Sequence, residues 1–192
     1  MKRLIIGDIH GHWDAFKSIY DLENADEVII LGDYFDNFHG SDESIKECFL
    51  DLAYLQKQHN AEKSGKFIML IGNHDYHYMN WYEKYSGYRS SYAPWAKIQL
   101  TELENEKLLQ YVYIDNINKI IYSHAGVSNS WLKENAKFDI CDKNLEYINK
   151  MNPTAFKFTY KGGGDCYGNS FYSSPIWIRP GALKLDLYKG DD

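Results

Sequence analysis

The fold is most readily inferred from one stretch near the amino terminus, Leu4-Ile5-Ile6-Gly7-Asp8-Ile9-His10-Gly11. Its apolar start is typical of a buried strand, and its glycines permit a tight backbone turn directly afterwards. Asp8 and His10 stand two residues apart, so an extended segment would point both side chains to one side. The stretch therefore predicts a strand that carries two ligand-type side chains at its carboxyl end.

The same pattern occurs twice more along the chain. The apolar run 28–31 is followed by Gly32-Asp33-Tyr34-Phe35-Asp36, and the run 67–71 is followed by Gly72-Asn73-His74-Asp75. Between these strands, the spacing of apolar residues predicts helices over residues 13–20 and 41–58. An alternation of strands and helices indicates an α/β sheet.

The second half of the chain predicts a mixture of elements. Residues 75–109 are polar and aromatic, and we expect them to be helical. A turn-rich insert at 115–118 lies between two apolar runs, which predicts a β-hairpin whose second strand leads into His124. Residues 128–152 have a helical pattern. Residues 153–175 hold too many turn formers for a regular element, and we expect a long loop that borders the active site.

The composition excludes several classes of protein. Of the 192 residues, 44% are hydrophobic and 25% are charged, as in an ordinary globular protein. We expect a single domain over residues 1–192. The net charge of −6 argues against strong nucleic-acid binding, which normally needs clustered Lys and Arg. Carboxylates that hold divalent cations can still attract phosphate, because the ions are then the largest local charges.

The cysteines and the apolar segments indicate a cytoplasmic protein. Cys48, Cys141 and Cys166 are odd in number and far apart, so they fit neither a disulfide framework nor a zinc pair. The apolar run before Gly7 is too short for a signal peptide, and no stretch approaches the length of a membrane span. We therefore expect a soluble, cytoplasmic protein that does not associate with membranes.

The polar clusters after the strands have a plain structural explanation when each is considered alone. Asp, Asn and His after a strand act as helix caps or turn formers more often than as metal ligands. Three such clusters occur at three separate strand ends, and His124 follows a fourth strand, so a chance arrangement of these residues is much less credible. The combination favours a metal site that is assembled from all four segments.

These motifs resemble those of the calcineurin-like metallophosphoesterases, and more narrowly the branch of Ser/Thr phosphoprotein phosphatases with bacterial and phage relatives. The resemblance covers most of the chain. It rests on Gly7-Asp8-Ile9-His10-Gly11, Gly32-Asp33-Tyr34-Phe35-Asp36, Gly72-Asn73-His74-Asp75, Ser123-His124-Ala125-Gly126-Val127 and Trp177-Ile178-Arg179-Pro180. It implies a two-sheet α/β sandwich flanked by helices, and a hydrolase that acts on phosphoesters.

The resemblance also implies two divalent metal ions. Asp8, His10 and Asp33 would hold the first ion, and Asp33 would bridge to a second ion that Asn73 and His124 also bind. Two cations that share a carboxylate and a hydroxide lower the pKa of that water and clamp the attacking and leaving oxygens. Carboxylate, amide and imidazole ligands suit Mn, Fe or Zn better than calcium, and we expect Mn first.

Three further roles follow from the resemblance. His74 would be the general acid that protonates the leaving alcohol, and Asp36 would orient its imidazole. Arg179 would grip the phosphate oxygens in bidentate fashion. The plain alternatives are a helix cap for Asp36 and a surface position for Arg179. His12, His39, His59 and His77 are not expected at the site, and His39 and His59 are expected in a loop or on an exposed helix.

Two departures from the family pattern affect these expectations. The family has Arg-Gly after the second aspartate, where this chain has Asn37-Phe38. Arg89 or Lys161 could compensate for the missing positive charge. The family also has a Gly-His signature downstream of the Arg179 segment, which this sequence lacks. The second metal site is therefore incomplete, and either the sequence is truncated at its carboxyl end or another group takes that place.

The expected substrate is a phosphorylated molecule, either a phosphoprotein or a nucleotide. A phosphomonoesterase of the Ser/Thr protein phosphatase type is the first expectation. A dinucleoside polyphosphate hydrolase or a nucleic-acid end phosphatase is the alternative among enzymes. A scaffold that kept the fold and lost turnover is the alternative of another class, although it would have no chemical need for His74, Asp36 and Arg179.

Overall fold

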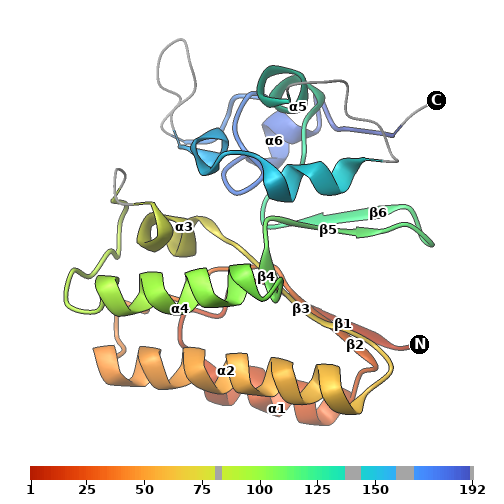
Figure 1. Ribbon diagram of the computed structural model, residues 1–192. Coiled ribbons are helices and arrows are strands. Elements are labelled where there is room, and N and C mark those ends of the chain that lie inside the picture. Colours follow the sequence, from red (N-terminus) through yellow and green to blue (C-terminus); the bar gives the residue numbers. More distant parts are fainter. Residues whose placement is uncertain (81–83, 137–143, 159–166, 191–192) are drawn as a thin grey trace. The chain divides into compact units, whose positions relative to one another are not determined.

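The computed structural model describes residues 1–80, 84–136, 144–158 and 167–190 (Figure 1). The chain forms two compact units, residues 1–110 and 111–192. In the described part of the chain, no helix combines the length and the apolar character that a membrane crossing requires.

The first unit is built on a parallel sheet with the strand order β1-β2-β3-β4. Its central strands β2 and β3 are buried along their whole length, as expected for a parallel sheet that is covered on both faces. Ile29 of β2 lies between Ile5 of β1 and Ile68 of β3 in the register. The strands are β1 (Arg3–Ile6), β2 (Glu27–Ile30), β3 (Phe67–Leu70) and β4 (Leu109–Gln110). The three strands predicted in this half are confirmed.

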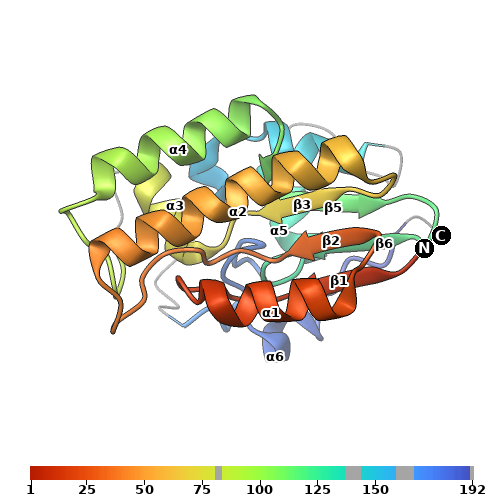
Figure 2. The ribbon, with the colours of Figure 1, turned by 90° about the horizontal axis from the view of Figure 1, so that it is seen from below.

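Helices connect these strands. The first unit contains α1 (Trp13–Glu23), α2 (Asp42–Glu62), α3 (Asn73–Met79) and α4 (Ala93–Asn105). Helices α1 and α2 lie side by side on one face of the sheet (Figures 1 and 2). The Phe16 ring of α1 packs against Phe67 of β3, with the ring centroids 6.2 Å apart. Ser41 caps α2 by accepting the backbone N–H of Ser44 at 3.1 Å.

The predictions for this half were accurate for the first two helices and too broad for the next segment. The helices predicted over 13–20 and 41–58 are α1 and α2, which both extend further. The helical stretch predicted over 75–109 is instead the short α3 and the separate α4, and residues 81–83 lie outside the described residues. Pro94 stands in the first turn of α4, a position where its missing N–H costs nothing.

A polar face of α2 fixes the edge of the sheet. The amide nitrogen of Gln56 donates to the carbonyl oxygens of Phe67 and Leu108, at 3.1 and 2.6 Å. His59 is buried, which corrects the expectation of an exposed position. Its Nε2–H donates to the Asp26 carbonyl at 2.9 Å, and its Nδ1 accepts from the Tyr20 hydroxyl at 3.0 Å. Both ring nitrogens of the neutral His59 imidazole thus have a hydrogen-bond partner.

This environment predicts a pH-dependent stability. Burial lowers the pKa of His59 below its ordinary value. The contribution of His59 to stability is therefore complete above its unfolded pKa of about 6.5 and is lost as the pH falls towards the folded pKa. We expect the free energy of unfolding to fall between about pH 7 and pH 5, and to fall less in His59→Gln. Urea unfolding at each pH measures this, and His39→Gln, at an exposed histidine, should behave as the wild type.

The second unit begins with the predicted β-hairpin. Strands β5 (Val112–Asp115) and β6 (Ile120–Ser123) are antiparallel, and their turn is fixed by Asp115. Its Oδ1 accepts the backbone N–H groups of Ile117 and Asn118 at 3.1 and 3.0 Å. A parallel and an antiparallel sheet, both accompanied by helices, confirm the α/β fold class.

Short helices make up the rest of the second unit. They are α5 (Asn129–Asn135), the 3-10 helices η1 (Leu145–Lys150) and η2 (Pro153–Phe156), and α6 (Pro180–Leu183). The prediction of one helix over 128–152 is therefore wrong, because α5 ends at Asn135 and η1 is a separate 3-10 helix that begins at Leu145. Residues 137–143 lie outside the described residues. The loop predicted over 153–175 contains η2, whose Phe156 stacks on Tyr111 at a centroid distance of 3.7 Å.

Candidate active site

The predicted ligands of the first unit follow three neighbouring parallel strands. Asp8 and His10 follow β1, Asp33 and Asp36 follow β2, and Asn73 opens α3 directly after β3. The segments after β1 and β2 are joined by backbone hydrogen bonds. The N–H groups of Ile9 and His10 donate to the Asp33 carbonyl at 3.0 and 2.8 Å. The carboxyl edge of the sheet is thus a single assembled surface, the usual place for a site in an α/β protein.

Asp75 joins the segments after β2 and β3. This fully buried carboxylate accepts the backbone N–H groups of Asp33, Tyr34 and Gly72, at 2.7, 2.8 and 2.9 Å. Burial, with the charge of Asp33, raises the pKa of Asp75, and the three backbone donors oppose this rise. One buried side chain thus provides an acceptor for all three backbone N–H groups.

Two glycines allow the same segments to approach each other. Gly32 has φ +120°, and a Cβ there would lie 2.4 Å from the backbone nitrogen of Gly72. A Cβ on Gly72 would lie 2.1 Å from Oδ1 of Asp33. Both distances are far below van der Waals contact, so neither position accepts a side chain without separating the strand ends.

Three predicted site residues have a left-handed backbone. His10, Asp33 and Asp36 have φ values of 43°, 56° and 66°. They are half of the six residues other than glycine with positive φ in the described part of the chain. This conformation costs roughly 1 kcal/mol or more for a residue with a side chain, and it persists where the surroundings enforce it. The strain is concentrated where the ligand-type side chains gather.

The geometry of His10, Asp8 and Asp33 fits a cation. The Nδ1–H of His10 donates to the Phe35 carbonyl at 2.5 Å, which leaves the lone pair on Nε2. That Nε2 lies 3.8 Å from Oδ2 of Asp33, and the ligand atoms of Asp8 and Asp33 lie within 4.8 Å of each other. Oδ1 of Asp33 accepts the backbone N–H of His74 at 2.8 Å. An imidazole with a fixed tautomer and two carboxylates is a typical donor set for a transition metal.

His74 and Asp36 form the predicted pair. Nδ1 of His74 lies 2.8 Å from Oδ2 of Asp36, whose side chain is buried. Burial raises the pKa of Asp36, but hydrogen bonds from His74 and His77 outweigh burial and lower it to about 2. Burial lowers the pKa of His74, but the hydrogen bond to Asp36 and the charge of Asp33 outweigh burial and raise it. The pair therefore favours a charged imidazole on a charged carboxylate.

His77 and Arg89 have positions that the sequence-based expectations missed. His77 touches Asp36, with Nε2 2.8 Å from Oδ2, and its spacing of three residues from His74 on a helix is the signal that could have indicated this. Arg89 holds the loop after Asp36 instead of facing the site. It donates to Asp42 at 2.9 Å and to the carbonyls of Gly40, at 2.8 Å, and Asn37. Lys161 lies outside the described residues.

The remaining predicted site residues belong to the second unit. His124 follows β6 and is half-buried in a turn where Ser123 Oγ accepts the N–H of Gly126 at 2.9 Å. Arg179 is exposed at the start of α6, and its Nε donates to the Tyr167 carbonyl at 3.1 Å. The structure therefore brings together Asp8, His10, Asp33, Asp36, Asn73 and His74 within the first unit.

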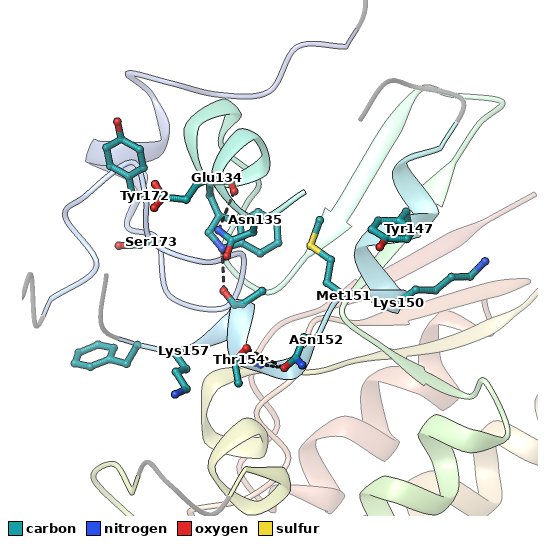
Figure 3. Close-up of a pocket in the computed structure, with 13 residues that line it drawn as sticks. Glu134, Asn135, Tyr147, Lys150, Met151, Asn152, Thr154, Lys157, Tyr172 and Ser173 are labelled. Carbon is teal, nitrogen blue, oxygen red and sulfur yellow. Dashed lines mark hydrogen bonds between the residues drawn. The ribbon is translucent and has the colours of Figure 1, made fainter. Parts of the chain in front are cut away.

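The second unit contains a cavity of about 730 Å³. Neither His124 nor Arg179 lines it. The amino groups of Lys150 and Lys157 point in different directions, and Asn152 bonds to Thr154 within η2 (Figure 3). The lysines of the cavity are not arranged around a common centre, so we assign it no ligand.

The family model of calcineurin-like phosphoesterases matches residues 1–179, and so covers both units. The chain belongs to this family. Among its relatives is the symmetrical bis(5'-nucleosyl)-tetraphosphatase of Wigglesworthia glossinidia brevipalpis, 32% identical over 142 residues, 68% of this chain and 47% of the relative. The protein of the same name from Serratia proteamaculans is 27% identical over 161 residues, 77% of this chain and 50% of the relative. The chain spans about half the length of these relatives.

The role of Asp75 gives a testable difference in stability. Asp75→Ala leaves three backbone N–H groups without an acceptor in a buried position, so we expect a loss of about 3 kcal/mol or more in the free energy of unfolding. Asp115→Ala is the matched control, because the buried Asp115 also accepts backbone N–H groups, but these belong to the exposed turn residues Ile117 and Asn118, which water can reach, and it should cost about 1 kcal/mol. Urea unfolding followed by circular dichroism measures both, and equal losses would contradict the assigned role.

Proposed function

We propose that this protein is a metal-dependent phosphoester hydrolase. The observation that supports this most is the gathering of Asp8, His10 and Asp33 at the ends of two neighbouring parallel strands, with the His74–Asp36 pair beside them. Two divalent ions, when bound, would supply Lewis-acid charge to the phosphate oxygens and make a water molecule acidic. The side chains of the protein would hold these ions, donate a proton and orient the substrate.

The proposed ligands divide into two sets. Asp8, His10 and Asp33 would bind the first ion, and Asp33, Asn73 and His124 would bind the second. The bond from His10 Nδ1 to the Phe35 carbonyl supports the first set, because such a partner fixes the orientation of the ring and leaves the lone pair of Nε2 for a cation. Mn is the proposed metal, with Fe or Zn as alternatives.

The proposed proton donor is His74. A leaving alkoxide needs a proton as its bond to phosphorus breaks, and a charged imidazole near neutral pH is suited to provide it. Asp36 binds Nδ1, which would leave Nε2 of His74 for the substrate. Arg179 is the proposed phosphate-binding group from the second unit. Arg89 is not proposed for this role, because Asp42 and backbone carbonyls occupy its guanidinium group.

The names of the relatives change which substrate class we propose first. The motifs alone favoured a phosphoprotein Ser/Thr phosphatase, but the relatives reported above carry the name symmetrical bis(5'-nucleosyl)-tetraphosphatase. We therefore place a dinucleoside polyphosphate first and a phosphoprotein second. It remains a prediction from the sequence that the chain is a single domain and that it is cytoplasmic. A nucleic-acid end phosphatase remains a further predicted alternative.

Metal dependence tests the proposed hydrolase. After treatment with EDTA, the protein should lose hydrolysis of p-nitrophenyl phosphate, and Mn²⁺ should restore it. Asp33→Asn should lower kcat/KM by about 10³-fold or more, because the proposed bridging carboxylate is lost. Asp51→Asn, at an exposed position of α2, is the control and should behave as the wild type. Equal activity of the two variants would refute the proposed site, and metal binding without turnover would support the scaffold alternative.

The order of substrates has its own test. With Mn²⁺ present, we expect kcat/KM for diadenosine tetraphosphate to exceed that for a phosphoserine peptide by about tenfold or more, a difference of about 1.4 kcal/mol in transition-state binding. Chromatography of the products shows the cleavage position, because symmetrical cleavage gives two ADP molecules. A preference for the phosphopeptide would reverse the order.

A further inference from the structure

We propose that His77 is a positioning residue that, together with Tyr78, holds the Asp36 carboxylate in the orientation required by His74. This inference rests on the proposed hydrolase function, in which His74 donates a proton. His77 would act through Asp36 and would not itself touch the substrate.

The contacts of His77 place it behind the pair. It follows His74 by one helical turn of α3 and is 1% exposed. Its Nε2 lies 2.8 Å from Oδ2 of Asp36, the same oxygen that lies 2.8 Å from Nδ1 of His74. The two imidazole rings are nearly perpendicular, at 78°, with centroids 5.8 Å apart. One carboxylate oxygen is therefore held between two imidazoles.

The tautomer of His77 follows from its other nitrogen. The backbone N–H of Tyr85 donates to Nδ1 at 3.2 Å, so Nδ1 carries the lone pair and the proton of a neutral ring is on Nε2. Nε2 lies 2.8 Å from Oδ2 of Asp36, but its N–H direction misses that oxygen too far for a regular hydrogen bond, so the contact is an electrostatic one between a polar N–H and a charged carboxylate. A neutral donor can orient the carboxylate without competing with His74 for its charge.

The second carboxylate oxygen is held by phenols. Tyr78 donates its hydroxyl proton to Oδ1 of Asp36, and its oxygen accepts the backbone N–H of Arg89 at 3.0 Å. The Tyr78 hydroxyl also lies 2.9 Å from the Tyr92 hydroxyl, and of these two acceptors the charged carboxylate binds its single proton more strongly. The Tyr92 hydroxyl lies 3.3 Å from the same oxygen. Gly87 packs so closely that a Cβ there would lie 2.8 Å from Cβ of Asp36.

These contacts fix the rotation of the carboxylate. A carboxylate bound by one partner can turn about its terminal torsion, which is broad and weakly restrained. Donors on both oxygens remove this freedom, and the position of His74 is then set through its bond to Oδ2. Small errors in the placement of a reacting group lower the reaction rate. The loss of one donor to Asp36 should therefore lower kcat mainly for substrates whose reaction is limited by proton donation.

The same three side chains could instead hold a cation. Ligand atoms of Asp36, His74 and His77 lie within 4.8 Å of one another. However, each nitrogen is 2.8 Å from the carboxylate oxygen, a hydrogen-bond distance. Two ligands on one tetrahedral zinc ion would be roughly 3.3 Å apart. These distances favour the positioning role, and addition of Zn²⁺ distinguishes it from cation binding.

Leaving-group dependence tests the positioning role in the full-length protein with Mn²⁺. The variants are His77→Leu, which removes the donor, and His77→Gln, whose amide can donate to Asp36. We expect His77→Leu to lower kcat for phenyl phosphate by about tenfold or more, and for p-nitrophenyl phosphate by at most about threefold, because the better leaving group needs less protonation. KM should be nearly unchanged, and His77→Gln should recover most of the rate.

His59→Leu is the matched control, because His59 is equally buried and bonded on both nitrogens but lies at the far end of α2 from the pair. It can destabilise the fold without changing the ratio of the two rates. Equal losses on both substrates, without recovery in His77→Gln, would overturn the proposal. A wild type that hydrolyses neither ester would overturn the proposed function, and with it the part of His77 in a reaction.

A second measurement does not depend on turnover. Nitrogen-15 spectra of the labelled histidines should show His77 with its proton on Nε2, and His77→Leu should shift the Nδ1 signal of His74. A proton on Nδ1 of His77 would overturn the proposal. Loss of the Nε2 proton on addition of Zn²⁺ would show a cation site instead and would also overturn it.

Discussion

The Asp75 carboxylate is the contact on which the site of the first unit depends. By accepting three backbone N–H groups from the segments after β2 and β3, it fixes the two loops that present Asp33 and Asn73. A buried carboxylate is costly unless its oxygens are fully bonded, and backbone donors provide this without a counter-ion. The lack of side chains at Gly32 and Gly72 lets the same two loops lie this close together.

The sequence predicted the parts that local patterns encode. The strands before Asp8, Asp33 and Asn73 are marked by apolar runs that end in glycine, and the structure has them at these positions. The hairpin around Asp115 was predictable because one carboxylate forms the turn from its own neighbours. The gathering of His10, Asp33 and His74 also followed, since adjacent parallel strands end at the same edge.

Positions whose partners lie far along the chain were missed. His59 appeared exposed because its helical neighbours are polar, yet Asp26 and Tyr20 enclose it. Arg89 bonds to residues about fifty positions earlier, and no local pattern records such a pairing. The helix predicted over 128–152 continued an apolar periodicity, but α5 ends at Asn135 and η1 is a 3-10 helix. For His59 and Arg89, long-range contacts and not local propensity decided the outcome.

The commitment of Arg89 to the loop after Asp36 has a consequence for how anions reach the protein. The guanidinium group of Arg89 is bonded to Asp42 and to backbone carbonyls, so it holds the loop in place and is not available to bind a substrate. The protein as a whole is acidic, with a net charge of −6. In the proposed hydrolase, attraction of a phosphate would therefore fall largely to Arg179 and to the ions bound by the proposed ligands of the first unit. The supply of metal in the surroundings would thus govern recruitment of the substrate as well as its turnover.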